Sequence, residues 1–468
     1  MHGIWIAVSA ERLYVLSTEL QDMKQPDAII IGAGAAGLAA AATLSDAGRS
    51  VLILEARTRI GGRIFTVRDP AFHMPVELGA EFVHGRPRAT WQLIRTAGLV
   101  AEDVPFESWE RRNGRLIHAT DFATELEKVM GGLSRVGRRD MSFAQYLRDR
   151  CSGRQLAHAR RLATMFVEGF DAADTERISA KALRKEQEGL GDLDEEPQFR
   201  LREGYGALVE YLRSRLKGPA ARIRLGQVVT SVIWKRGEVE VVCKTRRGAK
   251  KYRAARAIVT LPVGIVQLEL DAKGAVRFMP DLPQKRQAAL QLGAGPVVKV
   301  ICRFSQPFWE SASKVKSAGS AKELKDAGFF HDPDAAFPTW WTALPLRLCV
   351  LTGWSGGPKA EALSGRGRAA IMDAAVESLA HIFGMRRSAI SKLWEDAHLH
   401  DWPDDPLARG AYSYEMVGSQ GARARLAKSV EDTLFFAGEA TDMSGQASTV
   451  AGALASGERA AQELLKSM

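Results

Sequence analysis

Cysteine is scarce in this chain, with four residues among 468: Cys151, Cys243, Cys302 and Cys349. They lie far apart and form no C-x-x-C pair, the spacing typical of zinc sites and redox-active disulfides. This excludes a small disulfide-stapled scaffold and gives no support for a metal site. We therefore expect reduced thiols, a cytoplasmic location and no bound metal.

Long apolar runs are also missing. No stretch approaches the roughly 18 apolar residues of a membrane-spanning helix. The first 22 residues contain Glu11, Glu19 and Asp22 in place of the apolar core of a signal peptide. The sequence therefore predicts a soluble protein with no membrane partner. Residues 1–25 are expected to form an N-terminal extension, either loose or packed on the first domain as a helix.

No nucleic-acid-binding motif accompanies the net charge of +10. Arginines gather between residues 135 and 161, but this region has the period of amphipathic helices, which place such residues on a solvated face. An anionic cofactor accounts for part of the positive excess. We therefore expect no nucleic-acid partner.

What the sequence does contain is a glycine-rich turn between a short apolar strand, ending at Ile31, and an alanine-rich helix over residues 38–47. In a dinucleotide-binding turn, Gly32 allows the tight turn and Gly34 lets the backbone approach a pyrophosphate. Gly37 lets the helix pack closely on the strand. The N-terminus of the helix then faces the phosphates.

A second apolar strand over residues 51–54 ends at Glu55, about 20 residues beyond the glycines, where an acid binds the ribose hydroxyls of a dinucleotide. An acid at this position argues against a 2′-phosphate and therefore against NADP. Strand, turn, helix, strand and acid together predict a bound dinucleotide.

A basic turn with two adjacent glycines, from Arg57 to Arg63, follows this unit, and the chain then reads Leu78-Gly79-Ala80. Together with the glycine turn and Glu55, these segments resemble the flavin-containing amine oxidase family, which includes monoamine oxidases, polyamine oxidases and histone demethylases. The motifs of this family extend from Asp27 to Leu465. The resemblance implies that the cofactor is FAD.

Two further motifs lie near the C-terminus. Trp402 and Gly410-Ala411-Tyr412-Ser413 match the W…GxY segment of the family, and residues 434–441 match its FAGEAT motif. A helix is expected to begin near Thr449, and the resemblance implies that its N-terminus directs N–H groups and a positive dipole at the flavin ring. The FAD contacts that the resemblance implies are Gly32, Gly34, Ala36, Gly37, Glu55, Ala56, Arg57, Gly62, Arg63, Gly79, Ala80, Glu81, Phe82, Val229, Trp402, Gly438, Glu439, Thr449 and Val450.

Lys299 interrupts an apolar stretch, residues 292–304, that is expected to be one strand. Burial of an ammonium is costly unless a partner compensates the charge. A lysine on an edge strand, with its amine extended to solvent, is the alternative interpretation. The resemblance favours a catalytic role, because a lysine at this place in the family, ahead of a segment like Pro307-Phe308-Trp309, holds a water against the flavin N5.

The chain departs from the monoamine oxidases at two positions. Those enzymes attach FAD through a cysteine where this chain has Ala411, so we expect non-covalent FAD. They also flank the substrate nitrogen with two aromatic rings, and here the two positions are Tyr412 and Thr449. We take Lys299, Tyr412 and Thr449 as the candidate catalytic residues.

The expected fold is α/β. A Rossmann-like FAD-binding domain of the glutathione-reductase type, residues 26–85, 202–268 and 405–468, is interleaved with an α+β substrate domain, residues 86–201 and 269–404. Helical periods at 123–130, 141–150 and 155–166 predict a helical part of the substrate domain, and the remainder is expected to be a mixed sheet.

Two groups of residues in the substrate domain have an open assignment. Trp340, Trp341 and Trp354 are expected either to line a substrate cavity or, more commonly for aromatic residues at strand spacing, to pack in the core. The acidic stretch from Glu186 to Glu196 suits a cationic amine at a pocket mouth, but a solvated loop is the favoured interpretation.

The function implied by the resemblance is oxidation of a small-molecule amine by FAD. A hydride equivalent passes from the α-carbon of the amine to flavin N5, the imine hydrolyses to a carbonyl compound, and O2 reoxidises the flavin to give hydrogen peroxide. The sequence does not choose between monoamines, polyamines, amino acids and cyclic amines. Two alternatives are a flavin desaturase or dehydrogenase acting on C–C bonds, and a protein that binds FAD without redox turnover.

Overall fold

One lobe of the molecule is built on a five-stranded parallel sheet whose strands come from distant parts of the chain. The computed structural model describes residues 25–137, 139–190, 197–311 and 324–468, so the predicted N-terminal extension lies outside it except for residue 25. The sheet order is β10-β2-β1-β14-β23 and all neighbours run parallel. The strands are β1 (Ala28–Ile31), β2 (Val51–Leu54), β10 (Ala221–Arg224), β14 (Arg256–Val259) and β23 (Leu434–Phe436).

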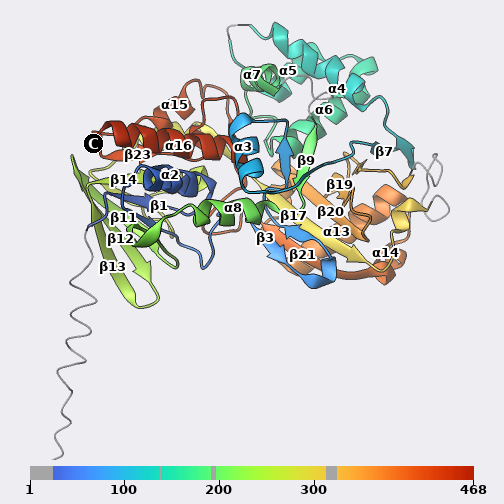
Figure 1. The fold of residues 1–468 in the computed structure, drawn as a ribbon. Coiled ribbons are helices and arrows are strands. Elements are labelled where there is room, and N and C mark those ends of the chain that lie inside the picture. Colours follow the sequence, from blue (N-terminus) through green and yellow to red (C-terminus); the bar gives the residue numbers. More distant parts are fainter. Residues whose placement is uncertain (1–24, 138, 191–196, 312–323) are drawn as a thin grey trace, which may run out of the picture.

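Both faces of this sheet are covered, as a parallel sheet of apolar strands requires. Helices α2 (Ala35–Asp46), α8 (Tyr205–Ser214) and α16 (Val450–Lys466) pack on one face, and α2 and α16 lie side by side (Figure 1). The other face packs on an antiparallel hairpin of β11 (Val228–Lys235) and β12 (Glu238–Thr245), which β13 (Gly248–Ala254) and β15 (Arg277–Met279) extend. Residues 236 and 237 form the turn of this hairpin.

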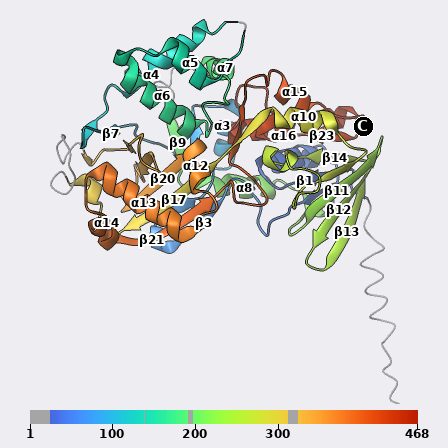
Figure 2. The same ribbon diagram turned by 180° about the vertical axis from the view of Figure 1, so that it is seen from behind.

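The other lobe holds a seven-stranded mixed sheet with the order β21-β17-β20-β19-β18-β7-β8. The pair β18–β7 is parallel and the other pairs are antiparallel. These strands are β7 (Ser108–Arg112), β8 (Arg115–His118), β17 (Val297–Phe304), β18 (Phe329–His331), β19 (Thr339–Thr342), β20 (Val350–Gly356) and β21 (Trp394–Asp401). Helices α12 (Gly357–Leu363), α13 (Arg368–Phe383) and α14 (Arg387–Leu393) accompany this sheet (Figure 2).

The single strand expected over residues 292–304 is wrong, because the chain forms two. β16 (Leu292–Gly295) pairs with β22 (Tyr412–Glu415), whereas β17 lies between β20 and β21 in the seven-stranded sheet. Pro296 separates them, and a proline has no N–H to continue a ladder. The break allows one continuous segment to contribute to two sheets.

A group of helices lies above the seven-stranded sheet in Figures 1 and 2: α4 (Phe122–Met130), α5 (Phe143–Arg150), α6 (Ala157–Phe170) and α7 (Ala180–Leu190). The three helices predicted between residues 123 and 166 are confirmed, although α6 continues four residues further, to Phe170. None of the helices within the described residues is both long enough and apolar enough to span a lipid bilayer.

Short elements connect the two lobes. β5 (Phe82–His84), β9 (Gln198–Leu201) and β6 (Ala101–Asp103) form a small antiparallel sheet, and β3 (Thr66–Arg68) pairs with β4 (Pro75–Glu77). The remaining α-helices are α3 (Arg88–Thr96), α9 (Val263–Val266), α10 (Pro283–Leu290) and α15 (Ala422–Ala427). The five parallel strands all fall within residues 26–85, 202–268 and 405–468, which we continue to propose as one domain.

Candidate active site

A cavity of about 520 Å³ extends between the two lobes. Its lining includes the turn between β1 and α2, the turn around residues 55–63, the loop before β5 and the start of α16. On the other side it is bounded by β17 to β20 and by α6 and α7. Every candidate site residue from the sequence except Gly37 lines this cavity.

The glycine turn has the geometry of a dinucleotide cradle. Gly32 has φ +105°, a conformation that side chains disfavour, and a Cβ on Gly37 would stand 2.0 Å from the carbonyl oxygen of Gly32. A Cβ on Gly62 would meet Gly34 Cα at 3.3 Å, so the two backbones approach closely beside the cavity. Helix α2 begins here with no side-chain cap, which leaves backbone N–H groups for an anion.

Glu55 lies at the end of β2 with its carboxylate held by backbone donors. Ala33 N donates to Oε2 and Arg57 N donates to Oε1, both at 2.7 Å. Each carboxylate oxygen retains a lone pair, so the group can also accept from ribose hydroxyls. The Arg57 side chain pairs with Asp405 at 2.9 Å, and the Arg57 carbonyl oxygen accepts from Gly226 N, so Arg57 is held in place beside the cavity. The glycine cradle and Glu55 together fit an adenine dinucleotide.

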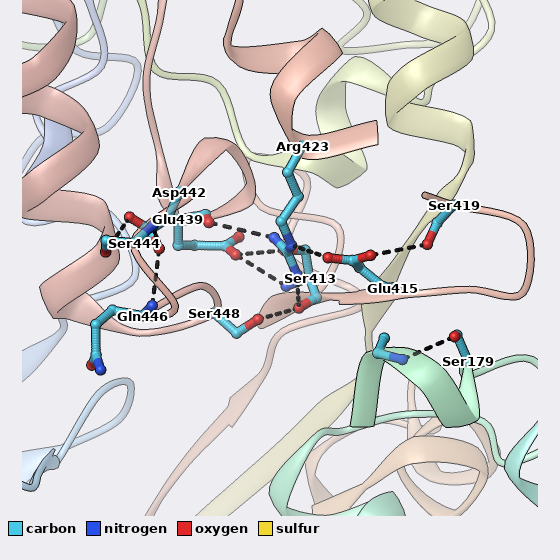
Figure 3. A network of polar contacts seen from close by, with 11 residues as sticks. Ser179, Ser413, Glu415, Ser419, Arg423, Glu439, Asp442, Ser444, Gln446 and Ser448 are labelled. Carbon is cyan, nitrogen blue, oxygen red and sulfur yellow. Dashed lines mark hydrogen bonds and ion pairs between the residues drawn. The ribbon is translucent and has the colours of Figure 1, made fainter. Parts of the chain in front are cut away.

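A polar network surrounds Glu439, which follows β23 and lines the cavity (Figure 3). Arg63 Nη1 donates to Glu439 Oε1 at 2.8 Å, and Ser413 Oγ donates to Oε2 at 2.6 Å. Arg423 in turn donates to Ser413 Oγ at 2.8 Å and pairs with Glu415 at 3.2 Å. Burial alone would raise the pKa of Glu439, but Arg63 and Arg423 outweigh it and lower that pKa. Both carboxylate oxygens of Glu439 therefore have hydrogen-bond donors. The network holds the segment after β23 in place at the cavity wall.

Lys299 is fully buried on β17, a strand with neighbours on both sides, so the edge-strand interpretation is wrong. Its Nζ lies 2.7 Å from Glu81 Oε2 and 3.1 Å from the carbonyl oxygen of Gly79. The Trp341 and Trp354 rings lie 5.5 and 5.9 Å from Nζ. The partner that the buried ammonium requires is therefore Glu81.

Glu81 also binds Arg200, which the sequence analysis did not single out. Arg200 Nη2 and Nε donate to Oε1 at 2.7 and 3.0 Å, and Trp341 Nε1 donates to the same oxygen at 3.0 Å. Although burial opposes ionisation, Lys299 and Arg200 lower the pKa of Glu81 to about 2. Both carboxylate oxygens of Glu81 thus have protein donors. A contact of Glu81 with FAD, as proposed from the sequence, would therefore be made by its backbone.

Tyr412 and Thr449 occupy the two positions expected to flank a substrate. The Tyr412 hydroxyl donates to the carbonyl oxygen of Phe170 at 2.6 Å, which fixes the ring at the cavity wall. The Thr449 hydroxyl accepts from Gly452 N at 3.1 Å and donates to Gln446 O at 2.7 Å. Thr449 is thus the N-cap of α16, and its hydroxyl is engaged in holding that helix end.

Aromatic side chains form most of the wall away from the glycine turn. Trp341 and Trp354 line the cavity, whereas Trp340 is fully buried in the core of the seven-stranded sheet. The other aromatic lining residues on this side are Phe82, His84, Phe106, Phe122, Phe166, Phe170, Phe329, His331 and Tyr412. Such a wall favours an apolar or cationic guest.

Two carboxyl groups interrupt this aromatic wall. Asp171, directly after α6, is buried, and among the described residues its Oδ2 has no hydrogen-bond partner. Glu186 lies on α7 and lines the same cavity. Burial raises the pKa of Asp171 well above its usual range, and the Glu186 charge raises it further. Burial also raises the pKa of Glu186 to about 7.

The solvated-loop interpretation of the acidic stretch is therefore wrong for Glu186, which is helical and faces the cavity. Residues 191–196 of that stretch lie outside the described residues. Asp171 was not singled out in the sequence analysis, although it lies only five residues beyond the predicted helix at 155–166. An acid there becomes distinctive only when the fold shows that it is buried and that its Oδ2 has no partner in the described part of the chain.

Sequence comparisons with known proteins point to one family, and structure comparisons point to one fold. Residues 35–465 match a family described as flavin-containing amine oxidoreductase. Polyamine oxidase 2 of Arabidopsis thaliana is 29% identical over 95% of this chain and 89% of its own length. A structure of putrescine oxidase bound to putrescine has a TM-score of 0.76 at 22% identity, covering 95% of this chain and 99% of that one. Cyclohexylamine oxidase from Brevibacterium oxydans IH-35A also has a TM-score of 0.76, at 21% identity and with the same coverage, so both share the fold.

Proposed function

Because this chain belongs to the flavin-containing amine oxidoreductase family, whose members oxidise amines with FAD, we propose that its substrate is a diamine or polyamine. The observation that carries the proposal is the buried Oδ2 of Asp171, which has no hydrogen-bond partner among the described residues and lies with Glu186 in the aromatic wall of the cavity. The relatives named polyamine oxidases and the fold neighbour bound to putrescine support the same class. Desaturation of a C–C bond is not favoured by any of these comparisons.

FAD supplies the oxidising equivalent for the amine and passes the electrons on to O2 when it is bound. We propose that the glycine cradle and the N-terminus of α2 hold its pyrophosphate and that Glu55 holds its adenosine ribose. The remaining proposed contacts are the lining residues named from the sequence. Non-covalent attachment, because Ala411 replaces the linking cysteine, release of hydrogen peroxide and a cytoplasmic location belong to the same proposal.

The two carboxyl groups are suited to bind the ammonium at the far end of the substrate. An ammonium brought into the cavity favours their ionised forms and so offsets the cost of burying them. The aromatic walls enclose the methylene chain and exclude water. A second amine, uncharged, then lies nearer Lys299, which orients the reacting end.

The test is anaerobic mixing of the purified yellow holoprotein with amines while the absorbance of the oxidised flavin is followed. The panel contains putrescine, spermidine, butylamine, cyclohexylamine and several amino acids. We expect putrescine or spermidine to bleach the band at least about tenfold faster than butylamine, because one charged hydrogen bond contributes about 1.5–3 kcal/mol.

The matched variant is the double substitution Asp171→Asn with Glu186→Gln. It should abolish the preference for the diamine while leaving the rate with butylamine within a few-fold of the native rate. Equal rates for both amines in the native protein would contradict the diamine proposal. A band that no amine bleaches but dithionite removes would contradict the amine substrate as well.

A further inference from the structure

Three buried charged side chains form a cluster beside the cavity, and we refer to Lys299, Glu81 and Arg200 as the Lys299 cluster. They come from β17, the loop before β5, and β9, so no two are close in sequence. All three are less than one-tenth exposed. Two cations share one carboxylate, which gives the cluster a formal charge of +1.

The two carboxylate oxygens of Glu81 accept hydrogen bonds from different donors. Glu81 Oε1 accepts from Arg200 and Trp341, so Oε2 is left to Lys299. Arg200 is anchored on its other side, where Nη1 donates to the carbonyl oxygen of Leu344 at 2.6 Å. The carboxylate therefore has a fixed orientation that presents one oxygen to the lysine.

Lys299 has an unused donor at the cavity. Among the described residues its Nζ has two acceptors, Glu81 and the carbonyl of Gly79, whereas an ammonium carries three N–H groups. Lys299 itself lines the cavity. A charged Lys299 therefore presents an N–H to a guest, whereas an uncharged Lys299 could present a lone pair.

Of the other titratable groups near the cluster, Glu77 interacts with it electrostatically: Lys299 lowers the pKa of Glu77 and Glu81 raises it. Glu77 accepts from Thr66 and from the Tyr205 N–H, and burial raises its pKa to about 7. His400, opposite Lys299 on β21, is directed to Asp405 at 3.0 Å. On β20 and β19 the neighbours are the uncharged rings of Trp354 and Trp341.

We propose that Glu81 is a positioning residue that keeps Lys299 as an ammonium, so that Lys299 offers the cofactor site a fixed N–H donor and does not act as a proton acceptor. The inference rests on the proposed function only in placing FAD in this cavity. The inference also gives Arg200 a role, because Arg200 keeps Glu81 oriented and paired even when Lys299 is replaced. It also requires no particular amine.

The test uses the FAD-loaded protein without substrate, so the choice of amine cannot affect it. The visible absorbance of the flavin is recorded from about pH 6 to about pH 10 for the native protein and for Lys299→Met. A charge beside the ring shifts this spectrum. We expect the two spectra to differ, and we expect no one-proton step in the native protein that Lys299→Met lacks, because Glu81 Oε2 pairs with Lys299 Nζ at 2.7 Å.

Glu81→Gln should behave differently, because Lys299 then faces Arg200 without a carboxylate. We expect a one-proton step in its spectrum within the same range, and the step should be absent from Glu81→Gln combined with Lys299→Met. Arg200→Met is the matched control: it disrupts the same buried cluster and lowers the melting temperature, but it should introduce no step. Glu81→Asp retains the carboxylate charge, so its spectrum should show no such step.

Three results would overturn the inference. One is a one-proton step in the native protein that Lys299→Met removes. Another is a native spectrum identical to that of Lys299→Met at every pH, since Lys299 would then not face the cofactor. The third is a Glu81→Gln holoprotein without a step. If Glu81→Gln does not retain FAD, the comparison of native protein with Lys299→Met still decides between the first two outcomes and the expected one.

Discussion

Two kinds of carboxyl group lie around the cavity, and their partners differ. Glu81 and Glu439 are each paired with arginine, and Glu81 also with lysine, so their pKa values are lowered in spite of burial. For Asp171 and Glu186, burial raises the pKa values. The first kind orders the protein around the cofactor, and the second kind is suited to bind a cation from outside.

At this scale we predict the effect of replacing Lys299 with methionine. FAD should stay bound, because Glu81 keeps Arg200 as a partner and Met fills a similar volume. Loss of a charged hydrogen bond worth about 1.5–3 kcal/mol should slow flavin reduction by amine or reoxidation by O2 roughly 10- to 100-fold. Stopped-flow measurement of each half-reaction checks this. Unchanged rates in both would remove Lys299 from the mechanism.

A second residue-scale prediction concerns pH. Because burial raises the pKa of Glu186 to about 7, an ammonium binding there must displace a proton below that pH. The ratio of kcat/KM for putrescine to that for butylamine should therefore rise up to about tenfold per pH unit towards pH 7 and level off above it. The ratio cancels the protonation of the reacting amine. Glu186→Gln should flatten the profile, and a native ratio independent of pH would contradict the proposed subsite.

Among the elements, the N-terminus of α16 combines a structural and a proposed cofactor function. Its first turn carries Thr449 and Val450 at the cavity, and the helix packs beside α2 against the parallel sheet. Thr449 accepts from Gly452 N and donates to Gln446 O, so one hydroxyl fixes both the helix and the preceding turn. The dipole of α16 is thereby directed into the cavity.

We predict that Thr449→Ala lowers the free energy of unfolding by about 1 kcal/mol, the usual cost of losing an N-cap. FAD affinity should fall as well, because the first turn of α16 loosens. Thr449→Ser keeps the hydroxyl and is the matched control. Urea unfolding of the apoprotein and titration of apoprotein with FAD separate the two effects. Native stability in Thr449→Ala would contradict the capping role.

On the scale of the whole molecule, the cavity lies between lobes assembled from separated parts of the chain. Its lining residues are drawn from four stretches of the chain, residues 31–122, 165–299, 329–354 and 402–453. A guest that fills it therefore contacts every proposed segment of the FAD-binding domain together with the substrate lobe. Binding to the native state alone stabilises that state.

Removal of FAD should accordingly lower the melting temperature of the whole protein, and adding FAD back should restore it in a concentration-dependent way. At a free FAD concentration about 100 times the Kd, the stabilisation is about 2.7 kcal/mol. Differential scanning calorimetry of holoprotein and apoprotein measures the shift. Identical transitions for the two forms would show that FAD does not bind in this cavity.

The sequence by itself determined the features that depend on neighbouring residues. The strand, glycine turn and helix near Gly32 follow from local backbone requirements, and the helices between residues 122 and 170 follow from the 3.6-residue period of their apolar side chains. The family motifs also led to FAD and to amine oxidation. Even the cost of burying Lys299 was evident, although its partner was not.

Only the tertiary structure decided which distant side chains meet. Glu81 lies 218 residues from Lys299 and 119 from Arg200 in sequence, so no local pattern could pair them. Asp171 and Glu186 became candidate ligands only when the fold placed both at one cavity wall and left Asp171 Oδ2 without a partner among the described residues. Burial and charge pairing set the electrostatics of this site, and both depend on how the chain packs in three dimensions.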